Sequence, residues 1–180
     1  MGMVSKSDTS ARFTSFAGKA IICHTVTYFV AGLLAAHFLN YAAILASPES
    51  GMRPITDRWV MAGPLLQPIR GLIFALVFYP LRACLFGHRD GWLLMGWVLV
   101  ALGILSTFAA APGSIEGMIY LKAGIIDQLK GWLEVVPQAL LFSALLWYWV
   151  KHPAKWLNWL LGIAFFVTLA LPLLGLLTSR

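Results

Sequence analysis

Long apolar runs separated by short polar connections dominate the pattern of this chain. Five runs have roughly the length that a helix needs to cross a bilayer, about 20 residues for a hydrocarbon core of about 30 Å. They cover residues 20–46, 59–85, 92–111, 132–150 and 155–177. We therefore predict an all-α integral membrane protein, a bundle of about five transmembrane helices that forms a single polytopic domain over residues 1–180.

A different pattern occupies residues 114–131, between the third and fourth predicted spans. Its apolar residues recur at close to helical spacing, and most of its charged residues fall elsewhere. This is typical of an amphipathic helix that either lies on the membrane surface or enters the bilayer as a shallow re-entrant element. The turn before it brings Ser114 and Glu116 together as an active-site loop would, but we interpret it as a tight turn that caps the helix.

Composition excludes an ordinary soluble domain. The 180 residues are 60% hydrophobic and 11% charged, whereas about a quarter of the residues in soluble domains are charged. The formal net charge of +6 at pH 7 does not predict nucleic-acid binding, because the basic residues are dispersed at the ends of apolar segments rather than clustered on one polar face. We expect membrane lipids as partners and no nucleic acid.

Lysine and arginine predict the orientation of the chain. With a cytoplasmic N-terminus, most basic residues lie on the cytoplasmic side, and those on the other side are mixed with acidic residues. Five crossings then leave the C-terminus outside. We expect the protein to be integral to a membrane, the bacterial inner (cytoplasmic) membrane.

Arg70 is the most informative residue, because a guanidinium near the middle of a bilayer is costly unless it faces protein, water or a counter-ion. Gln67 lies about one turn before it on the same helix face. Pro64 and Pro68 remove backbone donors, which predicts a kink in the outer half of the second span. We therefore predict that the face carrying Arg70 points into the bundle.

Other helices carry polar residues in the same predicted half of the membrane. Pro137 predicts a second kink beside Glu134 and Gln138, and the first span contributes polar residues near its outer end. We predict an outward-opening polar pocket around a buried Arg70. Its predicted ligand-binding residues are His37, Asn40, Gln67, Arg70, Glu116, Glu134 and Gln138.

The same side chains admit a structural interpretation. Arg70 would then form an ion pair with Glu116 or Glu134 and lock the bundle. Gln67 and Gln138 would form hydrogen bonds between helices, worth roughly 0.6 to 2 kcal/mol each. Both interpretations stay open at this point.

Cofactor chemistry finds little support in the sequence. His24 and His37 lie on one predicted helix, about 20 Å apart in depth and on nearly opposite faces, which does not suit a bis-histidine haem site. Cys23 and Cys84 have no CxxC or metal-ligand spacing, and we interpret them as core residues. We expect no cofactor and no metal.

Three functions fit these observations. The first is a small protein that binds or passes an anion or polar solute as a homo-oligomer, because so small a bundle can hardly enclose a path alone. The second is a structural or accessory subunit of a larger membrane complex. The third is a membrane-embedded enzyme acting on a lipid or isoprenoid head group, with Glu116 or Glu134 for acid/base work and Arg70 holding phosphate or carboxylate. We favour binding over catalysis, because no catalytic motif is present.

Overall fold

The computed structural model describes residues 12–39, 53–54 and 56–178, and these residues form helices joined by turns and short loops. Three of the helical stretches are long and apolar enough to cross a membrane. They are α1 (Phe13–Phe38), the stretch Ile125–Lys151 that joins α8 (Ile125–Lys130) to α9 (Trp132–Lys151), and α10 (Lys155–Thr178). They indicate a membrane location and confirm the predicted helical class.

The predicted bounds hold best for the last two spans. The predictions 132–150 and 155–177 match α9 and α10 to within one residue, because both segments are continuous apolar runs between short polar turns. The first span begins earlier than predicted, at Phe13, and residues 40–46 of that prediction lie outside the described residues.

The predicted second span, residues 59–85, is not one continuous helix. The structure divides this segment into α3 (Arg58–Met61), the 3-10 turn η3 (Gly63–Leu66), α4 (Gln67–Phe78) and α5 (Arg82–Gly87). Proline is the reason, because Pro68 has no N–H to return to the carbonyl four residues back. Gln67 instead donates its backbone N–H to the carbonyl of Pro64, three residues back. The predicted kink is thus realised as a 3-10 turn.

The third predicted span also ends early. It consists of α6 (Gly91–Val100) and the π-helical turn η4 (Ala101–Leu105), so residues 106–111 do not continue the helix. The single helix predicted over 114–131 is wrong as well. This segment forms two short helices, α7 (Ile115–Tyr120) and α8, because the chain is extended at Leu121 and bends at Lys122 and Ala123 before α8 begins.

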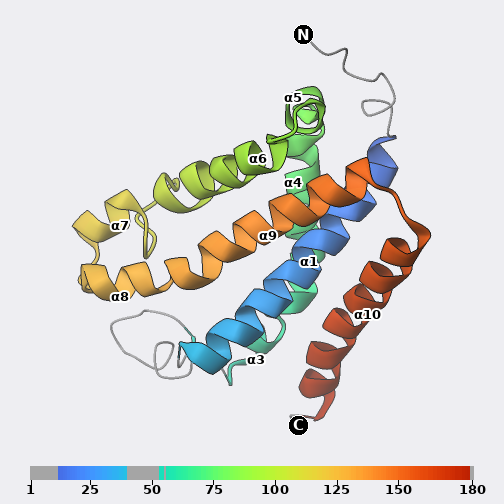
Figure 1. The fold of residues 1–180 in the computed structure, drawn as a ribbon. Helices are drawn as coiled ribbons and strands as arrows, with labels where there is room; N and C mark the ends of the chain where they lie inside the picture. The colour runs from blue at the N-terminus through green and yellow to red at the C-terminus, as the bar shows by residue number, and fades with distance from the viewer. Residues whose placement is uncertain (1–11, 40–52, 55, 179–180) are drawn as a thin grey trace.

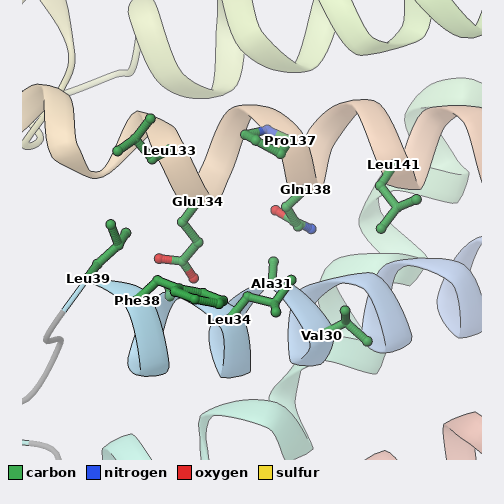
Figure 2. Close-up of a pocket in the computed structure, with 11 residues that line it drawn as sticks. Val30, Ala31, Leu34, Phe38, Leu39, Leu133, Glu134, Pro137, Gln138 and Leu141 are labelled. Carbon is green, nitrogen blue, oxygen red and sulfur yellow. The ribbon is translucent and has the colours of Figure 1, made fainter.

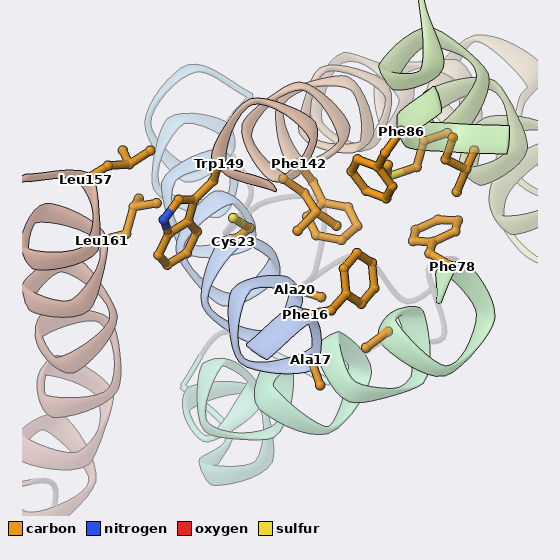
Figure 3. Packing of buried hydrophobic residues seen from close by; sticks show 14 residues of the cluster. Phe16, Ala17, Ala20, Cys23, Phe78, Phe86, Phe142, Trp149, Leu157 and Leu161 are labelled. Carbon is orange, nitrogen blue, oxygen red and sulfur yellow. The ribbon is translucent and has the colours of Figure 1, made fainter. Parts of the chain in front are cut away.

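The long helix α1 lies at the centre of the bundle. It packs against α4 on one side and α9 on another, α10 also contacts it, and α6 packs along α9 (Figure 1). The main apolar core fills the end of the bundle where α1 begins and α9 ends. There Phe16, Phe78, Phe86 and Phe142 meet, and Trp149 packs near Leu157 and Leu161 of α10 (Figure 3).

Candidate functional site

A buried histidine lies where α1, α4 and α9 meet. His24 is 2% exposed, and its Nε2 is 3.1 Å from Oε1 of Gln67 on α4. Its Nδ1 is 3.4 Å from Nε2 of Gln138 on α9. Gln67, itself buried, donates its own Nε2 to the carbonyl of Gly63 at 3.1 Å. Hydrogen bonds between side chains therefore connect three helices through one imidazole.

Aromatic rings enclose this imidazole. The ring of Phe74 lies edge to face with it at 4.8 Å between centroids, and the ring of Phe142 lies in the same manner at 5.5 Å. Water is excluded from such a site, so each hydrogen bond is stronger there and an unpaired polar atom is costlier. An arrangement that pairs both ring nitrogens of His24 is therefore strongly favoured over one that leaves either nitrogen unpaired.

A cavity of about 240 Å³ lies next to this cluster, between the second half of α1 and the first half of α9 (Figure 2). Its lining is apolar except for two side chains of α9, Glu134 and Gln138. Both project from α9 toward α1. Glu134 is partly buried, and its Oε1 would lie 3.9 Å from a Cβ placed on Gly32 of α1. The carboxylate thus sits against the first helix rather than in open surroundings.

Gln138 belongs to both features. It lines the cavity, and its amide nitrogen faces His24. Glu134 precedes it by one helical turn on the same face of α9. The cavity and the buried cluster are therefore one continuous arrangement of polar groups, held by the side chain of Gln138.

Arg70 does not take part in this arrangement. Its side chain is exposed and does not line the cavity, and its guanidinium lies 6.0 Å from the ring centroid of Phe74. The prediction that Arg70 is buried is therefore wrong. The reason is the choice of contact face on α4, because the close approach to α1 occurs at Gly71, which turns the neighbouring arginine outward.

The predicted ion pair is not formed either. Within the described residues the salt bridges join Arg53 to Asp57 and Lys130 to Asp127, and neither involves Arg70. The hydrogen bonds that the structural interpretation assigned to Gln67 and Gln138 are confirmed, but their shared partner is His24.

The remaining predicted site residues fall into three groups. Glu134 lines the cavity beside Gln138, although this cavity does not include Arg70. Glu116 on α7 and His37 on α1 are exposed and do not line the cavity; the ring of His37 lies against Phe38 instead. Asn40 lies outside the described residues.

Sequence reasoning missed the role of His24, which it tested only as a haem or metal ligand. The predicted bounds hid the pairing, because they place His24 near the inner end of the first span and Gln67 in the outer half of the second. In the structure α1 begins at Phe13, so His24 lies near the middle of the helix and meets Gln67 at the start of α4.

The turn at Pro112 to Gly117 is a helix cap, as predicted. Oγ of Ser114 accepts the backbone N–H of Gly117 at 2.9 Å and donates to the carbonyl of Ala111 at 2.8 Å. Gly113 adopts a φ of 86°, a left-handed conformation that favours glycine. These contacts account for the serine without any catalytic role.

No cluster of three or more histidine, cysteine or acidic side chains suited to a metal ion occurs among the described residues. Cys23 is buried, as predicted, whereas Cys84 is exposed, so its interpretation as a core residue is wrong. Comparison of the chain with models of protein families, with curated proteins and with solved structures found no match. The cavity and its two polar side chains, Glu134 and Gln138, are therefore the candidate site.

Proposed function

We propose that this protein binds an amphipathic, lipid-like molecule in the cavity between α1 and α9. The apolar part of the ligand packs against the aliphatic lining, and a hydrogen-bond-donating head group binds Glu134 and Gln138. One observation carries the proposal, namely a carboxylate and an amide placed together in an otherwise apolar cavity of about 240 Å³. Ligand sites are typically apolar hollows with a few polar groups that fix orientation.

The size of the cavity suggests how such a molecule sits. Ligand pockets usually measure about 300–1,000 Å³, so this cavity accommodates a head group and the first part of a chain. The rest of the chain would lie along the helices in the bilayer. The surrounding surface suits this, because Leu33 and Leu34 of α1 and Leu133 and Leu141 of α9 are exposed.

We propose that the chain crosses the membrane five times and that its N-terminus is cytoplasmic. The helices α4 and α6 are shorter than the other three, but they pack along α1 and α9 respectively. The apolar stretches Gly63–Phe78 and Gly91–Leu105, which include the turns η3 and η4, are each more than about 20 Å long. They complete the second and third crossings when α3, α5 and the adjoining turns are added.

The ligand class follows from the charge that faces the cavity. A buried Arg70 predicts binding of an anion or polar solute, and the exposed position of Arg70 removes the basis for an anion. The charged group at the cavity is the carboxylate of Glu134, which favours an ammonium or hydroxyl head group. Glu116 does not line the cavity, so it is not placed for acid/base catalysis on a head group bound there.

The test uses purified protein in nanodiscs of neutral lipid and a photoactivatable dodecylamine as the probe. Glu134→Gln should weaken amine binding by roughly 10- to 100-fold, because a hydrogen bond to a charged group contributes about 1.5–3 kcal/mol. Glu116→Gln is the matched control, since that carboxylate is exposed on α7, and it should bind the amine as the wild type does. Equal amine binding by both variants would reject the proposal.

A second variant separates site binding from partitioning into lipid. Ala31 lines the cavity, so Ala31→Phe should fill it and abolish saturable labelling. Labelled peptides should come from the facing parts of α1 and α9. Labelling spread evenly over all helices, and unchanged by Ala31→Phe, would indicate simple partitioning and would also reject the proposal.

A second function, subunit of a larger membrane complex, is favoured by Arg70. Its side chain is exposed on a face of α4 that also exposes Ile69, Ile73 and Leu76. A guanidinium on such a face costs about 2.5–3.5 kcal/mol near the bilayer centre unless an acidic group pairs with it. We propose that a transmembrane partner carrying an acidic residue docks on this face.

Native purification in mild detergent tests this second function. A stoichiometric partner with an intramembrane aspartate or glutamate should be lost with Arg70→Gln. Arg89→Gln is the matched control, since Arg89 is exposed in the turn before α6, and it should retain the partner. A homogeneous preparation of this chain alone, from both wild type and variants, would contradict the docking proposal.

A further inference from the structure

The orientation of the buried polar cluster can be deduced from one backbone carbonyl. The Gly63 oxygen can only accept a hydrogen bond, so the side-chain group of Gln67 that faces it at 3.1 Å must be the NH₂. The amide oxygen of Gln67 therefore faces His24. This assignment follows from the hydrogen-bonding capacity of the groups and needs no hydrogen positions.

The same reasoning assigns the proton on His24. The Gln67 oxygen, 3.1 Å from Nε2, is an acceptor, so Nε2 must carry the hydrogen. A neutral imidazole has one donor and one acceptor, which leaves Nδ1 as the acceptor. The amide nitrogen of Gln138 faces Nδ1 at 3.4 Å and supplies the matching donor.

The last step reaches the cavity. Because the NH₂ of Gln138 is engaged by His24, its amide oxygen is directed away from the imidazole. Figure 2 shows this oxygen on the side of Glu134. The two polar groups that line the cavity, Glu134 and Gln138, thus both present acceptor oxygens to a ligand.

We infer that His24 is a positioning residue that holds the Gln138 amide oxygen toward the cavity, and that it thereby selects primary-amine head groups over carboxylate head groups. This inference rests on the proposed function and deepens it. An ammonium donates up to three hydrogen bonds and satisfies both oxygens at once. A carboxylate meets two acceptors and is repelled by Glu134. An alcohol donates to one oxygen only and binds less tightly than the amine.

Binding of three probes with the same chain measures this selectivity. Dodecylamine, dodecanol and dodecanoate compete with the photoactivatable amine in nanodiscs of neutral lipid. The wild type should bind amine most tightly, then alcohol, then carboxylate. In His24→Leu the amide is free to turn, so amine affinity should fall about three- to tenfold, while alcohol affinity changes less than twofold, because an alcohol also accepts from an NH₂.

Thr27→Val is the matched control. Thr27 is buried on the same helix, and among the described residues its hydroxyl donates to two carbonyls of α1, those of Cys23 and His24. This variant should leave the ratio of amine to alcohol affinity at the wild-type value. An unchanged ratio in His24→Leu would overturn the inference, as would the same change in Thr27→Val.

A spectroscopic measurement on the wild-type chain tests the inference without depending on how His24→Leu folds. Nitrogen-15 NMR of protein labelled at histidine distinguishes a protonated from an unprotonated ring nitrogen. His24 should show a protonated Nε2 and an unprotonated Nδ1 at neutral pH, with assignment by substituting glutamine for the exposed His37, His88 and His152. The opposite tautomer, or an imidazolium, would overturn the inference.

The two failures can be told apart. If Glu134→Gln leaves amine binding unchanged, the proposed function fails, whatever tautomer His24 shows. If Glu134→Gln weakens amine binding but the ratio of amine to alcohol affinity is the same in His24→Leu as in the wild type, the cavity binds amines and only the role of His24 fails.

Discussion

Replacing Gly71 with alanine adds one methyl group where α1 and α4 come closest. The new Cβ would lie 2.6 Å from Cα of Ile21, and 3.2 Å and 3.3 Å from the carbonyl oxygens of Ile21 and Ala20. Carbon atoms in contact are about 3.5–4.0 Å apart, so the two helices must separate by roughly 1 Å. Because the contacted atoms all belong to backbone, no rotamer change relieves the overlap.

The separation destabilises the bundle in two ways. Overpacking of this kind costs about 1–3 kcal/mol. The contact between His24 and Gln67, at 3.1 Å, would also lengthen beyond hydrogen-bonding distance, which leaves buried polar atoms unpaired at a cost of about 1–3 kcal/mol. The higher helix propensity of alanine raises the free energy of unfolding by about 1 kcal/mol. We expect a net decrease of roughly 1–5 kcal/mol in the free energy of unfolding.

Unfolding in mixed micelles with increasing dodecyl sulfate, followed by circular dichroism, measures this decrease. Gly18→Ala is the matched control on α1, because a Cβ there has nothing within 4 Å. Its stability should equal that of the wild type or exceed it by up to about 1 kcal/mol. If Gly71→Ala proved as stable as Gly18→Ala, the close approach of α1 to α4 and the argument built on it would be refuted.

Three further predictions concern the turns. Gly117→Ala places a Cβ 1.9 Å from the carbonyl oxygen of Ala111, so hydrogen exchange of the α7 amides should rise more than in Ser114→Ala. Ser114→Ala removes the cap of α7 and should reduce local stability by about 0.5–2 kcal/mol, measured by the same exchange. The pKa of Asp57 lies below its ordinary value, mainly because its carboxylate accepts a hydrogen bond from the Trp59 N–H. The resulting stabilisation of α3 is present above about pH 4 and lost as the pH falls through the lowered pKa; exchange of the Trp59 amide should show this in the wild type and not in Asp57→Asn.

Proline has different effects at different positions in this chain. Pro64 and Pro68 stand at or near the ends of short elements, and there they replace an α-helical turn by a 3-10 turn. Pro137 lies inside α9 and Pro172 inside α10, yet both helices continue past them. The sequence signal is the same in each case, but neighbouring helices support the interrupted backbone of α9. Counting prolines therefore predicts where donors are missing but not whether a helix ends.

The face of α4 that packs against α1 shows why the site was only partly predictable. The buried positions of α4 are Gln67, Gly71, Ala75 and Phe78, a stripe at spacings of four, four and three residues. Arg70 is three residues from Gln67 and falls beside this stripe. Helical periodicity allows either face to point inward. Small side chains at 71 and 75 decide the matter, because they let the backbones approach closely.

The sequence by itself determined the properties that depend on the composition of single segments. Apolar runs of sufficient length predicted the membrane class and the bounds of α9 and α10, and Ser114 with its glycines predicted the cap of α7. Only the tertiary structure decided which polar groups meet. His24, Gln67 and Gln138 come from three helices, and their contact depends on the depth, rotation and separation of those helices. These quantities are set by packing between segments distant in the chain, which the pattern within any one segment does not contain.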